Sequence, residues 1–485
     1  MATPITPEQW LPVLAKMLDA RYQGEDNLAT PPSVTTNSKP GLAKLRRYAR
    51  GKADLPEMGQ NLKASWERFQ QKARTDYGGI AVRSLRNRIR VNGLRIGEKG
   101  DNPALARARR IWRDNRLDQQ VSQAIRDYLE CGISYLVVSL GDDRKAVVTR
   151  EAPEQFIAAT DPLRPHHAIA TLKVWRDPIA GLDHAQVVAA GAAQTFVRPT
   201  KTYTGSIHDS AAGDDWELDG DPVAIAGDPQ VAILDRGDDG AYLAPHLDVI
   251  DRINLGKLQR LVTTAMQAFR QRALRTKDGS AGLSDTDENG NAIDWARAFE
   301  PAPGALWDLP EGIDIWESQQ TDLQPMLEGE KVDARDFAAA TGTPISVLIP
   351  DGQNQSAEGA AASKEQQVAQ AGDDILYLKP VLAIAIVYAL RAEGVDLGDD
   401  TVEVLFAPPE HVSLQEKYAA AAQAKALGLS QRTIKSDILG MSPDQIAQDE
   451  TDAASDMLAQ ALLAVAQPSA PQTVVNNGPA DGAAD

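Results

Sequence analysis

Cysteine is almost absent from this chain, whose 485 residues contain only Cys131. A single cysteine excludes an internal disulfide and a cysteine-rich zinc site, and it fits a reducing compartment. Cys131 follows an apolar helical pattern and precedes an apolar run. We therefore expect a buried structural thiol here, and not a nucleophile.

Common enzyme signatures are also missing. The chain has no Gly-x-x-x-x-Gly-Lys-Ser/Thr loop for nucleotide phosphates, no Gly-x-Ser-x-Gly and no His-Glu-x-x-His. Among its six histidines the adjacent pair is His166-His167. Adjacent residues on a strand point to opposite faces, so this pair would not chelate one metal. We expect it to lie in a solvated turn after Pro165.

Nothing in the sequence indicates a leader or a membrane span. The N-terminus has no basic region followed by an apolar run. The most apolar run, Ile375 to Leu390, is interrupted by Lys379 and Pro380, and it is shorter than the ~20 residues that span a bilayer. We expect a soluble protein without a membrane partner.

Positive charge is scarce overall and concentrated in one stretch. The net charge is −18, yet residues 42–116 hold 20 Lys and Arg against 7 Asp and Glu. This stretch carries +13, so the remainder carries −31. It could face nucleic acid, an acidic partner or its own acidic remainder. The last alternative is the commonest in a single chain, and we favour it.

The patterns that are present predict a mixed α+β protein. The length allows roughly two to four compact regions. Thr6-Pro7-Glu8-Gln9 predicts a helix start with a capping box. Residues 77–88 and two segments within 102–132 have helical spacing. Strands are expected at the following positions: 89–96, 133–140, 168–175, 185–189, 231–234 and 402–406.

Two long helical patterns flank a polar loop. His246 to Thr276 lacks proline and predicts a helix about 45 Å long. A second helix is expected over 322–340, where Gly342 and Pro344 end it. The loop from Thr341 to Glu365 has nothing large and apolar between Pro350 and Ala360. By itself such a loop is most often an ordinary surface loop.

The regions around these helices differ in character. Residues 277–319 have turn residues and strand-like pieces such as 313–315, and predict a small separate module. After the loop we expect a long helix to Glu393, kinked at Pro380. Three helices follow, with Ser413, Ser430 and Ser442 as caps. Residues 467–485 are dominated by Pro, Ala, Asn, Gly and Asp and predict a disordered tail.

One acidic turn resembles half of a calcium loop. Asp285, Asp287 and Asn289 occupy positions one, three and five, and Gly290 occupies position six. Position twelve is Ala296, where a bidentate glutamate is needed. We interpret the segment as an acidic turn and expect no metal or cofactor.

The order of these features resembles the portal proteins of tailed bacteriophages. More specifically, it resembles the family typical of siphophages of Gram-positive and actinobacterial hosts. The resemblance covers nearly the whole chain. The stretches that carry it are 47–51 with Leu55-Pro56, 128–138, 246–254 and 340–344 with the following loop. The short Ala-rich segment 359–363 departs from the family pattern.

The resemblance implies a portal fold in a ring of twelve subunits at one capsid vertex. It implies an α+β wing over 1–245 and 364–408 and stem helices over 246–276 and 320–340. It further implies a small α/β clip over 277–319, a tunnel loop over 341–363 and a helical crown over 409–466. It implies a channel for packaging and ejecting double-stranded DNA, without sequence preference, in the virion and during assembly in the host cytoplasm.

The resemblance also implies site residues and partners, and no catalytic activity. The tunnel loop would present Asp351, Gln353, Asn354, Gln355, Ser356 and Glu358 to the DNA, and the stem would carry Lys257, Arg260, Arg270 and Arg272. These four cations could soften the repulsion between the acidic ring and DNA, or they could pair between subunits, which is the alternative that we favour. The implied partners are the terminase large subunit, a head-tail adaptor protein, and the major capsid and scaffolding proteins. ATP hydrolysis would belong to the motor.

Two other classes remain open at this point. A minor capsid or scaffolding protein should be mostly helical and lack the mixed middle region. A metal-dependent nuclease or hydrolase would need carboxylates, around Asp285 or Asp373-Asp374, that converge with a histidine or a metal. Their spacing in the sequence does not indicate such convergence.

Overall fold

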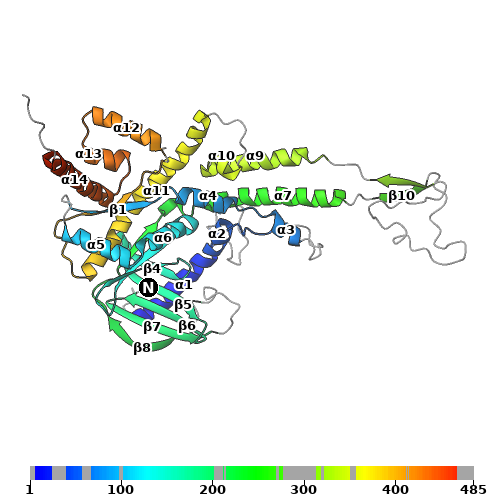
Figure 1. Ribbon diagram of the computed structural model, residues 1–485. Coiled ribbons are helices and arrows are strands. Elements are labelled where there is room, and N and C mark those ends of the chain that lie inside the picture. The colour runs from blue at the N-terminus through cyan, green and yellow to red at the C-terminus, as the bar shows by residue number, and fades with distance from the viewer. Residues whose placement is uncertain are drawn as a thin grey trace, which may run out of the picture.

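The computed structural model mixes helices and antiparallel sheets, as the sequence predicts (Figure 1). It describes residues 6–24, 40–56, 67–97, 102–200, 211, 215–268, 272–276, 313–317, 322–349, 357–410, 412 and 414–466. The described strands form sheets of two, two, three and five strands. Three of these sheets and most helices make a body from which two long helices project, and one two-stranded sheet lies beyond those helices (Figure 1). The predicted disordered tail, the calcium-like turn and Ser413 lie outside the described residues.

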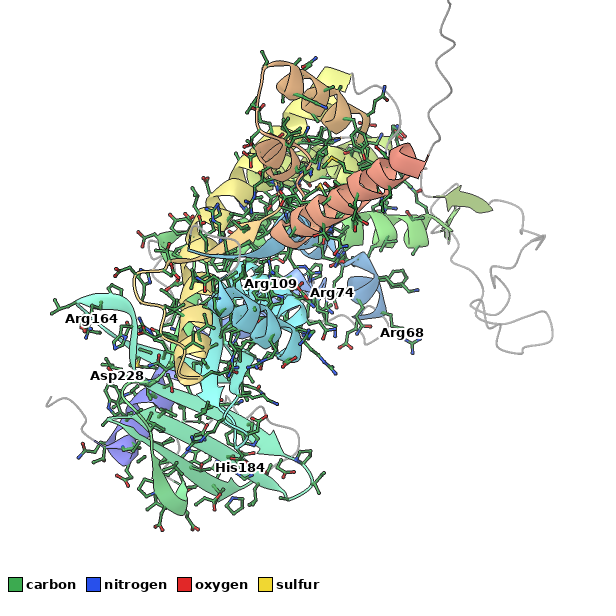
Figure 2. All side chains as sticks on the ribbon, turned by 60° about the vertical axis from the view of Figure 1, so that its left-hand side comes forward. Arg68, Arg74, Arg109, Arg164, His184 and Asp228 are labelled. Atoms are coloured by element: carbon green, nitrogen blue, oxygen red, sulfur yellow. The ribbon has the colours of Figure 1, made fainter. Side chains whose placement is uncertain are left out.

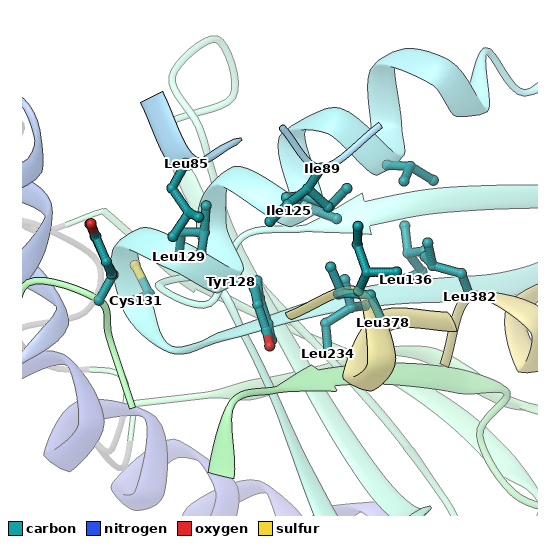
Figure 3. Packing of buried hydrophobic residues seen from close by; sticks show 14 of the residues in the cluster. Leu85, Ile89, Ile125, Tyr128, Leu129, Cys131, Leu136, Leu234, Leu378 and Leu382 are labelled. Atoms are coloured by element: carbon teal, nitrogen blue, oxygen red, sulfur yellow. The ribbon is translucent and has the colours of Figure 1, made fainter. Parts of the chain in front are cut away.

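The centre of the body is a three-stranded sheet in the order β3-β2-β9. Its strands are β2 (Ile133–Leu140), β3 (Ala146–Glu151) and β9 (Val231–Asp235). The helices α6 (Leu117–Cys131) and α11 (Ala357–Ala392) pack against it. Figure 3 shows Leu136 and Leu234 of the sheet close to Leu378 and Leu382 of α11. The predicted buried strand at 133–140 is confirmed, and Cys131 is buried.

A five-stranded antiparallel sheet forms the lower part of the body in Figure 1. Its strands, in spatial order, are β4 (Phe156–Asp161), β5 (Arg164–Asp177), β6 (Leu182–Ala189), β7 (Ala192–Pro199) and β8 (Glu217–Ala224). Helix α1 (Pro7–Gln23) packs on this sheet with Trp10, Leu11, Leu14 and Leu18 buried. These side chains and alternate residues of the strands form a second hydrophobic core.

Two local expectations are wrong in this part. His166 and His167 lie within β5 and not in a turn, and His167 Nε2 lies 2.9 Å from Asp228 Oδ2. Figure 2 labels Asp228 together with Arg164, at the start of β5, and His184 on β6. The α1 helix begins where Thr6-Pro7 predicts, but the Thr6 side chain makes no capping hydrogen bond.

Smaller elements surround the central sheet. The predicted strands at 89–96 and 402–406 are confirmed as β1 (Val91–Ile96) and β12 (Val402–Phe406), which pair antiparallel. The remaining helices of the N-terminal half are α2 (Leu42–Ala49), α3 (Glu67–Ala73), α4 (Tyr77–Arg86) and α5 (Pro103–Asp114). Short 3-10 turns η3 (Gly237–Asp239) and η4 (Ala244–His246) follow β9.

Long and short helices make up the C-terminal part. Helix α11 runs through Pro380 as one element and starts at Ala357, seven residues before the predicted boundary. It is followed after β12 by α12 (Leu414–Ala426), α13 (Gln431–Thr433), the π-turn η5 (Ile434–Ile438) and α14 (Pro443–Ala466). Ser430 caps α13 through Thr433 N. Ser442 and Gln445 form the predicted capping box.

One described helix, Lys364–Ala392, is long and apolar enough to cross a membrane by length and composition. In the structure this segment packs into the main hydrophobic core. Leu378, Leu382, Ile386 and Leu390 are each 1% exposed or less. A buried core helix meets the same length and composition test, so the segment carries no argument for a membrane.

Several arginines of the predicted basic stretch form ion pairs with acidic residues of the same chain. Arg107 and Arg110 of α5 both contact Glu393 after α11. Arg95 on β1 pairs with Glu403 on β12. Other arginines of the stretch, including Arg68, Arg74 and Arg109, are labelled in Figure 2. These arginines, together with Arg46, face the acidic remainder of the chain, as the favoured alternative predicts.

The most buried of these contacts centres on Arg46 of α2. Its guanidinium bonds to Glu154, before β4, with Nε to Oε1 at 2.6 Å and Nη2 to Oε2 at 2.9 Å. Nη1 lies 2.8 Å from Asp127 Oδ1 and 2.5 Å from Glu130 Oε2, both on α6. Desolvation is the largest single influence on Glu154 and raises its pKa, but the hydrogen bond and charge of Arg46, with smaller contributions from a backbone hydrogen bond and Arg150, together lower that pKa. One side chain thus joins α2, α6 and the start of the five-stranded sheet.

Replacing Arg46 with alanine is expected to lower the free energy of unfolding by about 3–5 kcal/mol, because three carboxylates lose a charged partner and the buried Asp127 and Glu130 keep only Arg150 and Arg126. Arg47→Ala is the matched control, since the Arg47–Asp54 pair is half exposed and should contribute no more than about 1 kcal/mol. Urea unfolding of both variants measures the difference. Equal losses would show that the buried cluster is not an anchor.

Candidate functional site

The two projecting helices are the most distinctive feature of the molecule. Helix α7 (Leu247–Ala268) and helix α9 (Gln324–Thr341) lie side by side (Figure 1). At 1.5 Å per residue they are about 33 and 27 Å long. Beyond them β10 (Arg272–Thr276) pairs antiparallel with β11 (Ile313–Glu317). We call α7 and α9 together the arm.

The predicted stem helix 246–276 is therefore too long. Helix α7 ends at Ala268, and residues 272–276 form a strand. Helical spacing alone did not show that the helix gives way to a strand. The strand depends on residues 313–317, far along the chain, where Glu317 lies opposite Arg272. The strand-like residues 313–315 are confirmed within β11. The second predicted helix, 322–340, is confirmed as α9.

The base of the arm is anchored in the body. Asn254 of α7 is fully buried, and its Oδ1 accepts hydrogen bonds at 3.0 Å from both the backbone N and Oγ1 of Thr75. Tyr48 Oη donates to Asp251 at 2.7 Å. Phe337 of α9 is fully buried, and its ring stacks on Tyr77 with centroids 6.3 Å apart.

Burial stops partway along both helices. Leu258 is the last buried residue of α7 whose side chain is described, and Ala334 is the first in α9. Beyond these positions the described side chains are exposed or only partly buried. The outer half of the arm is therefore held mainly by contacts between its own two helices.

Ion pairs within the chain join the two helices. Arg260 on α7 contacts Glu330 on α9. Arg252 contacts both Asp333 and Asp336, at 2.9 and 3.0 Å. Together the two helices carry five Lys and Arg against six Asp and Glu. The arm is thus nearly neutral, and arginines along its length have acidic partners beside them.

The four predicted stem cations have different environments. Arg260 has Glu330 of its own chain as a partner, and its pairing between subunits stays a prediction. Lys257 lies 5.0 Å from the centre of the Tyr77 ring, and burial lowers its pKa. Arg272 lies on β10 and not on a helix. Arg270 lies outside the described residues.

The predicted tunnel loop is shorter than 341–363. Gly342 ends α9 with φ of 63°, a left-handed conformation that glycine adopts without strain. The short helix α10 (Ile345–Leu348) follows, and α11 begins at Ala357. Glu358 belongs to α11. Asp351, Gln353, Asn354, Gln355 and Ser356 lie outside the described residues.

The end of α9 is tied to the body by Tyr242, which the sequence did not single out. Tyr242 Oη donates to the backbone O of Thr341 at 2.6 Å in a buried site. Thr341 Oγ1 in turn contacts Thr343 Oγ1 at 2.9 Å. The last carbonyls of a helix lack partners within it, and the tyrosine satisfies one of them.

The aspartates weighed for an enzyme do not converge. Asp374 Oδ1 accepts hydrogen bonds from Arg236 Nε at 3.0 Å and Tyr128 Oη at 3.1 Å, whereas Asp373 is exposed. Burial raises the pKa of Asp374, and Arg236 acts against this shift. Among the described residues, no group of three His, Cys, Asp or Glu side chains could hold a metal. Asp285 lies outside those residues.

Comparisons with known proteins gave remote structural likenesses. No protein-family model matches the chain, and no curated protein matches it. A chain in the neck of an empty gene transfer agent particle is similar, with a TM-score of 0.41 and 14% identity, over 86% of this chain and 96% of that one.

Two further solved structures share this distant similarity. The virion of the native gene transfer agent contains a chain with a TM-score of 0.39 and 13% identity, matched over 90% of this chain and 99% of that one. An HK97-family phage portal protein from Corynebacterium diphtheriae has a TM-score of 0.31 and 13% identity, over 67% and 91% of the two chains. Likenesses at these scores are too distant to assign a fold or a function.

The Tyr242 contact yields a test of how α9 is anchored. We expect Tyr242→Phe to lower the free energy of unfolding by about 1–3 kcal/mol, because the buried Thr341 carbonyl loses its donor. Tyr377→Phe removes the same hydroxyl from a side chain that is 56% exposed, and should change stability by less than about 0.5 kcal/mol. Thermal and urea unfolding compare the two. An unchanged Y242F variant would contradict the anchoring role.

Proposed function

We propose that this protein is a phage portal protein, a ring of identical subunits around a channel for double-stranded DNA. The observation that carries the proposal is the arm, whose outer half has no buried side chain among the described residues. Isolated helices are marginally stable in water, and so is a two-stranded hairpin. Neighbouring copies arranged around an axis would supply the missing contacts along the arm.

Exposed apolar side chains on the C-terminal helices support a multimer. Met457, Leu458 and Leu462 of α14 are 68%, 64% and 63% exposed, and Leu414 and Tyr418 of α12 are 72% and 63% exposed. They lie on two helices, α12 and α14, that are at the same end of the molecule (Figure 1). Apolar residues gathered on a surface in this way indicate an interaction site. In the proposed ring they pack against the next subunit.

The distribution of charge suits a conduit. Each phosphate that a lysine or arginine neutralises adds affinity through counterion release, and many such contacts would hold DNA in place. Arg252 and Arg260 of the arm are already paired with carboxylates. The chain as a whole carries −18. A ring of such subunits would let DNA slide without strong binding.

The finer parts of the proposal are the twelve-subunit ring at a capsid vertex, with packaging and ejection through it. Terminase, adaptor, capsid and scaffolding proteins are its proposed partners, and the chain itself has no catalytic role.

The alternative that this chain is itself a scaffolding protein is less well supported, because the described body contains three- and five-stranded sheets. A metal-dependent nuclease is less well supported because Asp374 is engaged by Arg236 and Tyr128.

Negative-stain microscopy and mass photometry test the assembly. We expect rings with a central hole from the purified chain. Replacing Leu458 and Leu462 with glutamate should shift the population toward smaller species, because charge would enter the apolar contact. Gln460→Glu adds charge on the same helix outside the apolar pair and serves as the control. A compact monomer, or an assembly without a hole, would refute the proposal.

A second test concerns the loop before α11. Deleting residues 351–359 is expected to leave ring formation intact and to impair DNA packaging or genome retention, because the loop is the proposed contact with DNA. Ring formation is scored by microscopy and packaging by nuclease-protected DNA in assembled particles. Loss of rings in the deletion variant would show that the loop has a structural role instead.

A further inference from the structure

A small cavity of about 260 Å³ opens on the body between β1, α5 and α6. Its apolar lining consists of Ile89, Val91, Trp112, Val121 and Ile125, of which Val91 and Trp112 are partly exposed. Pockets for small molecules are typically ~300–1,000 Å³. This cavity is smaller, and its size suits one or two apolar side chains from another protein surface.

Positive charge without a carboxylate partner lies beside the cavity. Arg90 is exposed and lines it, and Arg86 at the end of α4 is half-buried. Neither arginine forms an ion pair with another residue that the structure describes. Burial, and then the charges of Arg126, Arg83 and Arg90, lower the pKa of Arg86, so these arginines lie close together.

The nearby carboxylates are already engaged. Arg83 pairs with Asp76, and Arg126 pairs with Glu130. Asp118 also lines the cavity, and its Oδ1 accepts a hydrogen bond from Trp112 Nε1 at 2.9 Å. Arg86 and Arg90 outnumber this carboxylate, so the mouth of the cavity carries about one net positive charge. An apolar group with a negative charge beside it would complement this surface.

Helix α14 presents the complementary pattern. Every side chain from Thr451 to Leu462 is exposed, so the helix does not fill the cavity of its own chain. The helix contains five Asp and Glu and no Lys or Arg. Glu450, Ala454, Leu458 and Leu462 recur every four residues, and therefore lie along one face. That face is acidic at its N-terminal end and apolar at its C-terminal end.

Both surfaces lack a partner within the described chain. Helix α14, β1 and α5 lie in the same part of the body (Figure 1), and Asn92 of β1 donates to the backbone O of Gly440 at 3.2 Å. A single helix is marginally stable in water, so an exposed helix gains from a partner. Identical subunits in a ring join through two different surfaces, which must complement each other.

On the basis of the proposed ring of identical subunits, we propose that α14 of one copy docks on this cavity of the next copy. Leu458 and Leu462 cover the apolar lining, and Glu450 pairs with Arg86 or Arg90. The occupant of the cavity is thus a second copy of this chain. The contact joins the basic stretch of one subunit to the acidic C-terminal helix of its neighbour.

Disulfide trapping tests the contact directly. Cys131 is the only cysteine and is buried, so introduced thiols give a clean signal. Ser122→Cys places a thiol on the cavity lining, and Ala461→Cys places one beside Leu458. An equal mixture of the two full-length variants, assembled and mildly oxidised, should give at least tenfold more linked dimers than either variant alone. Ala459→Cys, on the other side of α14, is the matched control and should not link.

Charge reversal tests the recognition. Arg86→Glu with Arg90→Glu in the S122C chain should lower the yield of linked dimers at least tenfold. Glu450→Lys in the A461C chain should recover at least threefold of that loss, whereas Asp456→Lys, on the opposite face, should recover none. If the arginine variants do not fold, the cysteine pair decides alone, because Ser122 and Ala461 are exposed.

The outcomes separate this contact from the ring itself. Linked dimers in assemblies without a central hole would support the contact and refute the ring. Rings in which A461C does not link to S122C, or in which A459C links equally well, would overturn the contact and leave the ring. So would rings in which S122C reacts with a maleimide as fast as in monomers, because the cavity would then be open to another protein. A chain that stays monomeric would overturn both.

Discussion

The arrangement of this molecule depends on one constraint. The body buries only the inner part of each of the two long helices, α7 and α9. Up to Leu258 in α7, and from Ala334 onward in α9, apolar and polar contacts with the body hold the helices. Outside these limits the helices have each other and a few ion pairs, and exposed pairs contribute at most about 1 kcal/mol each. The outer half of the arm therefore has few stabilising contacts within its own chain, and α12 and α14 also carry exposed apolar side chains.

Ion pairs within the chain reduce the number of unpaired arginines that other molecules could contact. Arg46, Arg107 and Arg110 are bound to carboxylates of other elements, so much of the basic stretch is withdrawn from solvent-facing roles. The buried Arg46 cluster also fixes α2 against α6 and the five-stranded sheet. The same contacts therefore help to assemble the body, in a chain whose net charge is −18.

Polar contacts at the base of the arm link its position to the core. Tyr242 holds the end of α9, and Asp374 on α11 is held by Arg236 and Tyr128 (Figure 3 shows Tyr128). Between these two anchors lies a cavity of about 440 Å³. The body and the less buried arm therefore meet where these polar contacts lie.

Local patterns in the sequence sufficed for much of the fold. Apolar spacing located α6, β2 and α9, and cap residues located the starts of α13 and α14, because these signals depend on neighbours within a few residues. The mixed α+β class followed from the same spacing.

Only the tertiary structure decided how distant segments meet. Residues 272–276 form a strand because 313–317 pair with them, and Arg260 binds Glu330 of its own chain because α7 and α9 lie side by side. The partners of Arg46 and the donors to Asp374 are likewise far away in the sequence. Such contacts depend on the packing of the whole chain, and spacing along one segment carries no information about them.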